Sequence, residues 1–263
     1  MDKIAAKKSL GQNFLHDNNI IEKIVNSNKV NKEDLIIEIG PGKGAITSKL
    51  KKFGSKIICY EIDERMRPIL SELEDDNLRV IYGDFLSKDV IKDIEDINYE
   101  NIYVYGNLPY YITTPIIEKI ITSKLDLIAM TIMVQNEVAD RFTAKPKSKQ
   151  YNSLTIYLNY YFDIEKLFIV KNTCFTPVPK VESAVVRFSK KENKYNVINE
   201  SHFFKLINDS FKFKRKTLKN NLSGYNWDII EKVLLENNYS INVRAEEIDI
   251  NTFVLISNTL SNK

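Results

Sequence analysis

Glycine, cysteine and histidine are all scarce in this chain of 263 residues. The eight glycines make up about 3% of the residues, against an average share of roughly 7%. Two cysteines, Cys59 and Cys174, are too few for a disulfide framework or a cysteine-rich zinc site. Because the only histidines are His16 and His202, we expect no metal site. The two thiols are expected to be reduced and buried.

Long apolar segments are missing as well. The apolar run 127–134 is too short to span a bilayer. The first residues, 1–13, contain no apolar signal core. We therefore expect a cytoplasmic protein that does not bind membranes.

Neither sign of charge dominates the chain. It has 38 Lys and Arg against 35 Asp and Glu, which leaves a net charge of +3. With 43% hydrophobic and 28% charged residues, the composition is typical of a globular protein and not of a disordered or fibrous one. The length suits one large domain or two unequal ones. The total charge does not indicate a nucleic-acid partner, so that question depends on where the charges lie.

Strand and helix patterns alternate along residues 1–189. The predicted strands are residues 35–39, 56–61, 78–82, 102–105, 127–134, 164–170 and 183–189. The predicted helices are residues 17–30, 45–53, 64–74, 87–96 and 113–123, with another beginning near 135. Residues 152–162 fit either element, and we favour a helix. This alternation predicts an α/β domain whose parallel sheet is covered on both faces.

The pattern changes after a polar stretch at 189–194. Four helical patterns follow, from about 199 and near 214–222, 227–236 and 250–260, with no strand among them. We therefore predict two domains, an α/β domain at 1–189 and a small helical domain at 190–263.

Three glycines, Gly40, Gly42 and Gly44, follow the first predicted strand directly and precede a helix. Glycine there lets the backbone turn tightly and approach a ligand. Glu61 ends the next strand, where a carboxylate can accept hydrogen bonds from ribose hydroxyls. The pattern predicts a nucleoside-containing cofactor, and the alternative is a tight turn with a surface glutamate.

The glycine loop alone does not identify the cofactor. Residues 40–45 also satisfy a relaxed dinucleotide fingerprint, which leaves a NAD-dependent enzyme as a remote alternative. No second nucleotide-binding half is visible, and Asp84 adds a carboxylate suited to the exocyclic amine of adenine. S-adenosylmethionine, a nucleoside with a cationic tail, fits these features better.

A turn at Asn107, Leu108, Pro109 and Tyr110 follows the fourth predicted strand. An exocyclic amine on an aromatic ring is a weak nucleophile, because its lone pair is delocalised. The Asn107 side chain and the Leu108 backbone carbonyl could accept its hydrogens and turn the lone pair toward a methyl sulfonium. Pro109 stiffens the turn, and Tyr110 can stack on a base. Taken alone, these four residues could equally form an ordinary turn.

Several longer motifs point to one family. They are Lys8–Leu15 (KSLGQNFL), Glu38–Gly44 (EIGPGKG), Glu61–Asp63, Gly83–Phe85, Asn107–Tyr110, Gln135–Ala139, Phe175–Ser183 and Lys214–Leu222. With these motifs the chain resembles, nearly end to end, the KsgA family of ribosomal RNA adenine N6-dimethyltransferases.

The resemblance implies a Rossmann-like class I methyltransferase domain, with a seven-stranded, mostly parallel sheet and an all-helical C-terminal domain. It implies that Asn13 and Leu15 close over S-adenosylmethionine. The residues implied to contact this cofactor are Gly40, Gly42, Glu61, Asp84 and Asn107. The implied substrate is a pair of adjacent adenosines in the 3′-terminal hairpin of small-subunit (16S) rRNA. We expect a monomer.

Erythromycin-resistance methyltransferases share this core but modify large-subunit (23S) rRNA, and that activity is an alternative. The segments 144–151, 181–184 and 214–218 are similar to the small-subunit branch. Two residues depart from it, since Lys147 and Asn152 stand where that branch commonly has glycine. A mainly non-enzymatic role as a ribosome-assembly checkpoint is a further alternative, although an intact Asn107 and Asp84 favour catalysis.

The basic residues are unevenly distributed. Residues 190–263 sum to +3, whereas residues 1–189 sum to zero. The predicted RNA-binding residues lie in two runs without an acid, Lys145, Lys147 and Lys149 in one and Lys212, Lys214, Arg215, Lys216 and Lys219 in the other. Such clusters neutralise phosphates and release counterions, and the plainer alternative is a solvated helix face.

Overall fold

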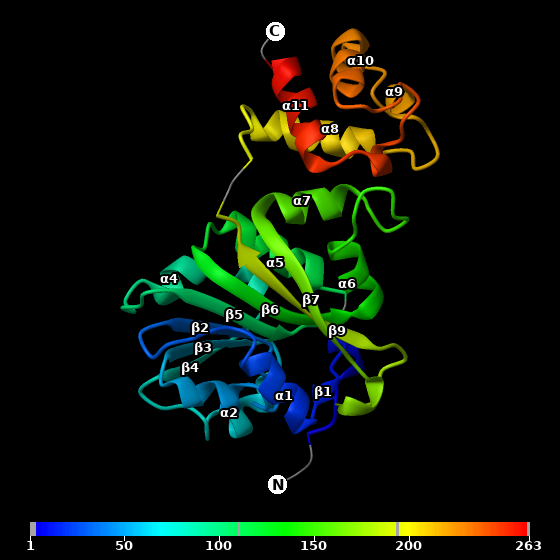
Figure 1. The fold of residues 1–263 in the computed structure, drawn as a ribbon. Helices are drawn as coiled ribbons and strands as arrows, with labels where there is room; N and C mark the ends of the chain where they lie inside the picture. Colours follow the sequence, from blue (N-terminus) through cyan, green and yellow to red (C-terminus); the bar gives the residue numbers. More distant parts are fainter. Residues whose placement is uncertain (1–3, 110, 193–194, 262–263) are drawn as a thin grey trace. The chain divides into compact units, whose positions relative to one another are not determined.

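A computed structural model describes residues 4–109, 111–192 and 195–261 (Figure 1). The chain forms two compact units, which are described separately. The sheet unit comprises Met1–Ala139 and Glu165–Lys190, and the helical unit comprises Asp140–Ile164 and Lys191–Lys263.

A seven-stranded sheet with the strand order β4-β3-β2-β5-β6-β9-β7 forms the centre of the sheet unit. Its strands are β2 (Leu35–Ile39), β3 (Lys56–Glu61), β4 (Leu78–Tyr82), β5 (Ile102–Asn107), β6 (Leu127–Gln135), β7 (Phe162–Val170) and β9 (Ser183–Lys190). Strands β4, β3, β2, β5 and β6 pair in parallel, and β9 pairs with β6 in the antiparallel direction. The predicted mostly parallel, seven-stranded sheet is confirmed.

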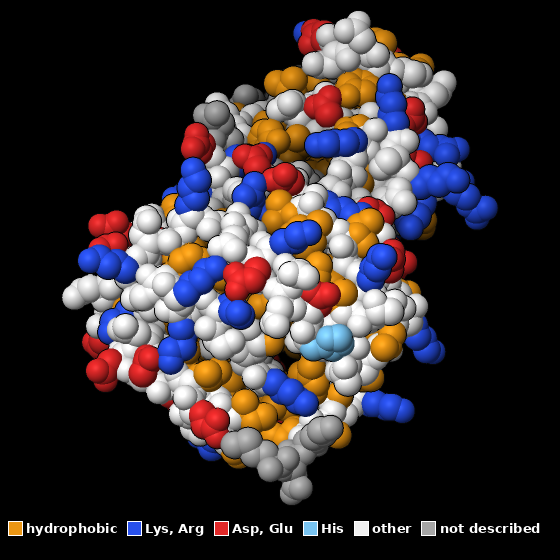
Figure 2. Space-filling view, turned by 60° about the horizontal axis from the view of Figure 1, so that its bottom comes forward, with side chains coloured by type: hydrophobic (Ala, Val, Ile, Leu, Met, Phe, Trp, Pro, Cys, Tyr) orange, Lys and Arg blue, Asp and Glu red, His pale blue; other side chains and the backbone are white. Residues whose placement is uncertain are grey.

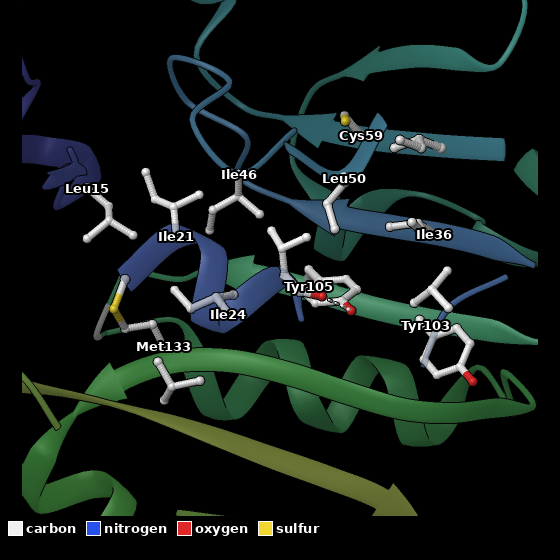
Figure 3. Close-up of a cluster of buried hydrophobic side chains, with 14 of the residues drawn as sticks. Leu15, Ile21, Ile24, Ile36, Ile46, Leu50, Cys59, Tyr103, Tyr105 and Met133 are labelled. Atoms are coloured by element: carbon white, nitrogen blue, oxygen red, sulfur yellow. Dashed lines mark hydrogen bonds between the residues drawn. The ribbon is translucent and has the colours of Figure 1, made fainter. Parts of the chain in front are cut away.

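Helices cover both faces of this sheet (Figure 1). On one face lie α1 (Asn18–Val25), α2 (Thr47–Leu50) and α3 (Arg67–Leu70), and on the other lie α4 (Val90–Ile94) and α5 (Thr113–Thr122). Helix α1 buries Ile21, Ile24 and Val25, because residues three and four apart share one helix face. Figure 3 shows Ile21 and Ile24 in the same buried cluster as Leu15, Ile46 and Tyr105.

The register of the sheet brings several chain segments to one edge. Ile39 at the end of β2 pairs with Tyr60 of β3 and with Gly106 of β5. The amide of Gly40 donates to the Tyr60 carbonyl at 2.9 Å. The loops that follow β2, β3 and β5 therefore begin side by side, although they are far apart in sequence.

A short antiparallel pair that the sequence analysis did not anticipate ties the N-terminal segment to this unit. Strand β1 (Phe14–Leu15) pairs with β8 (Phe175–Thr176). Beside it, the His16 amide donates to the Cys174 carbonyl at 3.0 Å, and the His16 side chain is exposed. Cys59 is a buried free thiol as expected, whereas Cys174 is half-buried and its Sγ reaches the Asp17 carboxylate at 3.7 Å.

The helical unit is organised around an aromatic core. Its helices are α7 (Ser153–Tyr161), α8 (Glu200–Ser210), α9 (Leu218–Asn221), α10 (Trp227–Glu236) and α11 (Ile250–Ser261). Tyr160 packs against Phe203 and Phe204, with ring centroids 5.5 and 5.1 Å apart. Helix α6 (Asn136–Phe142) runs across the division between the two units.

One division between the units falls between residues 190 and 191, close to the predicted boundary, but a further segment that was assigned to the first domain groups with the second. Residues 140–164 group with the helical unit, because Tyr151, Ile156 and Tyr160 belong to its buried core. The favoured helix at 152–162 forms as α7, and β7 begins directly after it without a connecting loop.

The helix predicted near 214–222 begins later than expected. Only Leu218–Asn221 are helical, and residues 211–217 form turns and bends. Thr217 caps the helix by accepting a hydrogen bond from the Asn220 amide at 3.4 Å, so the helix cannot extend back through the basic run. The structure also shortens the predicted helices at 17–30, 64–74 and 87–96.

Both departures from the usual glycine have a structural explanation. Lys147 adopts a φ of 73°, a left-handed conformation that normally favours glycine, and its amide donates to the Glu246 carbonyl at 2.7 Å. Asn152 is the N-cap of α7, and its side chain accepts from the amides of Leu154 and Thr155. Lysine is thus tolerated at a glycine-like backbone position, while asparagine gains a capping role.

No helix in the part of the chain that the structure describes has both the length and the apolar character needed to cross a bilayer.

Candidate active site

A cavity lies at the carboxyl edge of the sheet, where the loops after β2, β3, β4 and β5 converge. Ligands of open α/β sheets bind at this edge. All nine described residues that were predicted for catalysis or cofactor binding line this cavity: Asn13, Leu15, Gly40, Gly42, Glu61, Asp84, Asn107, Leu108 and Pro109. Tyr110, the remaining predicted residue, lies outside the described residues.

The glycine loop forms one wall of the cavity, and it is tightly packed at Gly42. Gly42 has a φ of 56°, and a Cβ placed there would lie 3.3 Å from the Phe14 ring. The Phe14 ring also carries the Lys43 ammonium 4.7 Å from its centroid. The N-terminal segment therefore packs directly on the loop, and a larger residue at position 42 would disturb both.

Glu61 is buried at the end of β3 and oriented by the backbone. One carboxylate oxygen accepts from the Gly42 amide at 2.9 Å, and the other accepts from the Asp63 amide at 2.7 Å. Burial raises the pKa of this carboxyl, although the two amide donors oppose the shift. The glycine loop and Glu61 therefore form one connected structure at the edge of the cavity.

Glu38 is a second buried carboxyl beside the cavity, and the sequence analysis assigned it no role. Only 1% of the residue is exposed, and the Cys59 thiol donates to its Oε2 at 3.7 Å. Burial raises the pKa of Glu38 to about 7, and the neighbouring Glu61 adds to the increase. A glutamate in the middle of an otherwise apolar, buried strand is the feature of the sequence from which this raised pKa could have been predicted.

Asp84 differs from these buried acids because it is exposed at the cavity. Its Oδ1 accepts from the Leu86 amide at 3.0 Å, which holds the side chain at the start of a short turn. Two apolar residues that were not predicted complete this part of the lining. Phe85 is buried, whereas Ile62 is 46% exposed, unusual for a large apolar side chain next to a buried strand.

Asn107 at the end of β5 is oriented by the N-terminal segment. Its Nδ2 donates to the backbone carbonyl of Asn13 at 3.0 Å. A carbonyl oxygen can only accept, so this contact sets which end of the amide faces Asn13. Oδ1, the acceptor, is consequently directed away from Asn13.

The chain after Asn107 has little freedom. A Cβ at Gly106 would lie 2.8 Å from the Leu108 side chain and 3.1 Å from the Ile39 carbonyl oxygen. Leu108 is buried, and the Pro109 carbonyl accepts from the Ile112 amide at 3.1 Å. The backbone next to Asn107 is thus held by packing and by the start of α5.

A third contact ties the N-terminal segment to the cavity. The Gln12 amide group donates to Asp63 Oδ2 at 2.8 Å, and Arg65 pairs with the same carboxylate at 2.6 Å. Arg65 and, to a lesser degree, Gln12 lower the pKa of Asp63 to about 2. Gln12 and Phe14 were missed as site residues, although both lie in the motif that contains Asn13.

The predicted RNA-binding residues all belong to the helical unit. Figure 2 shows Lys and Arg side chains gathered at one edge of this unit. Seven of these eight residues lie in turns or loops, and Lys219 lies in α9. All eight are exposed: Lys145, Lys147, Lys149, Lys212, Lys214, Arg215, Lys216 and Lys219. The two basic runs were assigned to different domains from the sequence, and the structure places them in the same unit.

Comparison with known proteins gives a consistent result along the chain. The model of the family described as ribosomal RNA adenine dimethylase matches residues 3–262. A Bacillus pumilus protein named ribosomal RNA small subunit methyltransferase A is 43% identical over 265 residues, covering 97% of this chain and 91% of the relative. A protein of the same name from Enterococcus faecalis is 39% identical over 267 residues, covering 97% and 90%.

Solved structures share the same fold. A dimethyladenosine transferase from Plasmodium falciparum has a TM-score of 0.76 at 25% identity, covering 92% of this chain and 95% of that one. The 23S rRNA methyltransferase ErmE has a TM-score of 0.75 at 22% identity, covering 95% and 100%. These matches confirm the predicted Rossmann-like methyltransferase fold.

Proposed function

The chain belongs to the ribosomal RNA adenine dimethylase family, and from this premise we propose that it dimethylates N6 of two adjacent adenosines in the 3′-terminal hairpin of small-subunit (16S) rRNA, using S-adenosylmethionine, during small-subunit biogenesis. The proposed setting is the cytoplasm, and the proposed active form is a monomer.

The lining of the cavity suits S-adenosylmethionine, a nucleoside with a positively charged sulfonium in its tail. Three carboxyl groups line the cavity, Glu38 in β2, Glu61 at the end of β3 and Asp84 after β4, and the exposed Asp84 in particular favours a cation. In our assignment Gly40 and Gly42 approach the cofactor through their backbone, Glu61 accepts from the ribose hydroxyls, and Asp84 accepts from the adenine amine. Asn13 and Leu15 close over it.

When bound, S-adenosylmethionine supplies a methyl group that its positive charge has already activated. The residues of this chain then have to align a weak nucleophile. Asn107 Oδ1 and the Leu108 carbonyl accept the hydrogens of the target N6 amine, so that its lone pair turns toward the methyl carbon. The cofactor would supply its methyl group to the nitrogen and retain the electron pair of the C–S bond as a neutral thioether, and the proton of the methylated nitrogen would pass to water. Pro109 holds the turn rigid, and Tyr110 stacks on the target base.

The observation that carries this proposal is the hydrogen bond from Asn107 Nδ2 to the Asn13 carbonyl. With the nitrogen of the Asn107 amide held by Asn13, the acceptor oxygen is already available to the substrate amine before the substrate binds. The amide therefore needs no reorientation when the amine arrives, which is the type of preorganisation that lowers a reaction barrier.

Methyl-labelled S-adenosylmethionine tests the substrate assignment. The protein is incubated with small subunits that lack these methyl groups, with large subunits and with tRNA, and the labelled nucleotides are mapped. We expect label only on N6 of the two adjacent adenosines of small-subunit RNA. Label only in large-subunit RNA would favour resistance-type methylation instead, and binding of small subunits without label would favour a pure assembly role.

Substituting Asn107 tests its proposed role. Because one acceptor and the alignment are lost, we expect Asn107→Ala to lower kcat by at least about 100-fold while small-subunit binding is retained. Asn101 is a matched control that immediately precedes the opposite end of β5, where its Nδ2 donates to Asp34 at 2.8 Å. Asn101→Ala should affect stability and leave kcat unchanged, and a normal kcat in Asn107→Ala would contradict the role of Asn107.

A further inference from the structure

Phe213 is an exposed aromatic residue in the middle of the basic turn at 212–216, the segment that joins α8 to α9. It is 54% exposed, although it is one of the largest apolar side chains. Its neighbour Phe211 packs inward, with ring centroids 6.2 Å from Tyr151 and 6.1 Å from Phe253. The turn therefore sends one phenylalanine into the core and presents the other to solvent.

The backbone that presents Phe213 is held at both ends by one side chain. The Asn221 side-chain oxygen accepts from the Phe213 amide at 3.1 Å, and its nitrogen donates to the Phe213 carbonyl at 3.3 Å and to the Ser210 carbonyl at 2.7 Å. The Lys216 amide also donates to the Phe213 carbonyl at 3.1 Å. Hydrogen bonds therefore fix the backbone that carries the ring, while the ring itself is exposed to solvent.

The charges around this ring are almost all positive. Within the described residues, Lys214, Arg215 and Lys216 form no ion pair in the structure, and the Lys212 ammonium lies 5.7 Å from the Phe213 ring centroid. Asp209, the nearest acid in sequence, already pairs with Lys205 at 2.6 Å and accepts from Tyr225 at 2.7 Å. A partner at this turn must therefore combine a flat apolar face with negative charge.

We propose that Phe213 stacks on an unpaired base of the rRNA substrate while the flanking cations contact the adjacent phosphates. An unstacked nucleotide offers an aromatic face and a phosphate within one residue's length, which fits this turn. An apolar protein surface would leave the surrounding cations without partners. The inference rests on the proposed function, because it specifies how the same rRNA is held by the helical unit.

Two substitutions distinguish stacking from general apolar contact. Phe213→Leu keeps an apolar side chain without a ring, and Phe213→Trp keeps an aromatic ring. Affinity for unmethylated small subunits is measured at several salt concentrations. We expect Phe213→Leu to bind about 5- to 10-fold more weakly with an unchanged salt slope, because stacking does not release counterions. Phe213→Trp should bind at least as tightly as the wild type.

Leu235 provides a matched control, since it is 56% exposed in the same unit and far in sequence from the basic turn. Leu235→Ala should bind like the wild type. The sole tryptophan of the chain is Trp227, so wild-type fluorescence gives the background for the Phe213→Trp variant. Quenching of the added indole on binding would support stacking.

Wild-type affinity in Phe213→Leu, or no quenching in Phe213→Trp, would overturn the inference. Either result would leave the proposed function intact if the wild type still methylates small-subunit adenosines. Failure of the proposed function would instead appear as absence of that methylation in the wild type, before any variant is compared.

Discussion

At the scale of single residues, Lys147 is the clearest case of a side chain in an unfavourable position. Its φ of 73° costs a non-glycine residue about 1 kcal/mol. We expect Lys147→Gly to relieve this strain, in part offset by the greater freedom of glycine in the unfolded chain. The expected result is a gain of up to about 1 kcal/mol in unfolding free energy, measured by chemical denaturation.

A nearby lysine controls for the loss of charge. Lys145 is exposed in the same loop and does not adopt a positive φ, so Lys145→Gly should not increase stability. Equal gains in both variants would show that charge repulsion, and not backbone strain, governs this loop. Both variants should bind RNA slightly more weakly if the loop contacts phosphate.

At the scale of elements, the start of α7 depends on Asn152. Its side chain accepts from the amides of two residues of the helix. In turn, the Thr155 hydroxyl oxygen accepts from the Asn152 amide at 3.3 Å. Asn152→Ala should therefore lower the unfolding free energy by about 1 kcal/mol, whereas Asn152→Gly should lower it by only a few tenths. Denaturant midpoints of the two variants test this, and equal losses would show that the cap is not what stabilises the helix.

Local patterns were sufficient to predict the parallel strands and their helices. Strands such as 35–39 are buried throughout and, apart from Glu38, apolar, because both faces are covered, and this makes them recognisable in the sequence. The position of Gly40, Glu61 and Asn107 at one sheet edge also followed, since parallel strands bring their carboxyl ends together.

Contacts between distant segments could not be predicted in the same way. The β1–β8 pair is two residues long on each strand and joins segments 160 positions apart in sequence, so no local pattern marks it. The Asn107–Asn13 bond likewise joins segments 94 positions apart and was missed for the same reason. The grouping of 140–164 with the helical unit depends on tertiary packing of Tyr151 and Tyr160, which periodicity alone does not reveal.

At the scale of the whole molecule, Glu38 should impose a pH dependence on stability. Its folded pKa of about 7 lies above its ordinary value of 4.5, so the folded state holds the proton more tightly than the unfolded state. The contribution of Glu38 to the unfolding free energy therefore falls as the pH rises from about 4.5 to 7, and it levels off above that. At pH 8 the cost is about 3 kcal/mol.

Glu38→Gln removes the ionisation and retains a side-chain acceptor for the Cys59 thiol. We expect the variant to lose most of the fall in stability between pH 5 and 8, measured by denaturation without cofactor. A smaller fall should persist, because burial also raises the pKa of Glu61. The difference in unfolding free energy between pH 5 and pH 8 is compared for the wild type and the variant, so any pH-independent effect of the glutamine on stability cancels. Asp63, with a pKa of about 2, changes stability only below this window. An unaltered pH profile would show that Glu38 stays ionised in the folded protein.

Net charge takes on a different meaning once it is counted by unit. The helical unit has 15 Lys and Arg against 11 Asp and Glu, a charge of +4. The sheet unit has 23 against 24, a charge of −1. The small total of +3 thus combines a nearly neutral unit that contains the cavity with a basic unit that carries both exposed lysine runs.

This distribution predicts where salt sensitivity of RNA binding originates. Replacing Lys214, Arg215 and Lys216 with glutamine should flatten the plot of log affinity against log salt by up to about one unit per lost phosphate contact. The control replaces Lys29, Lys32 and Lys56, which precede or begin β2 and β3 at the edge opposite the cavity. It removes the same charge and should leave the slope unchanged. If both triple variants flatten the slope equally, total charge governs binding and the basic turn is ordinary surface.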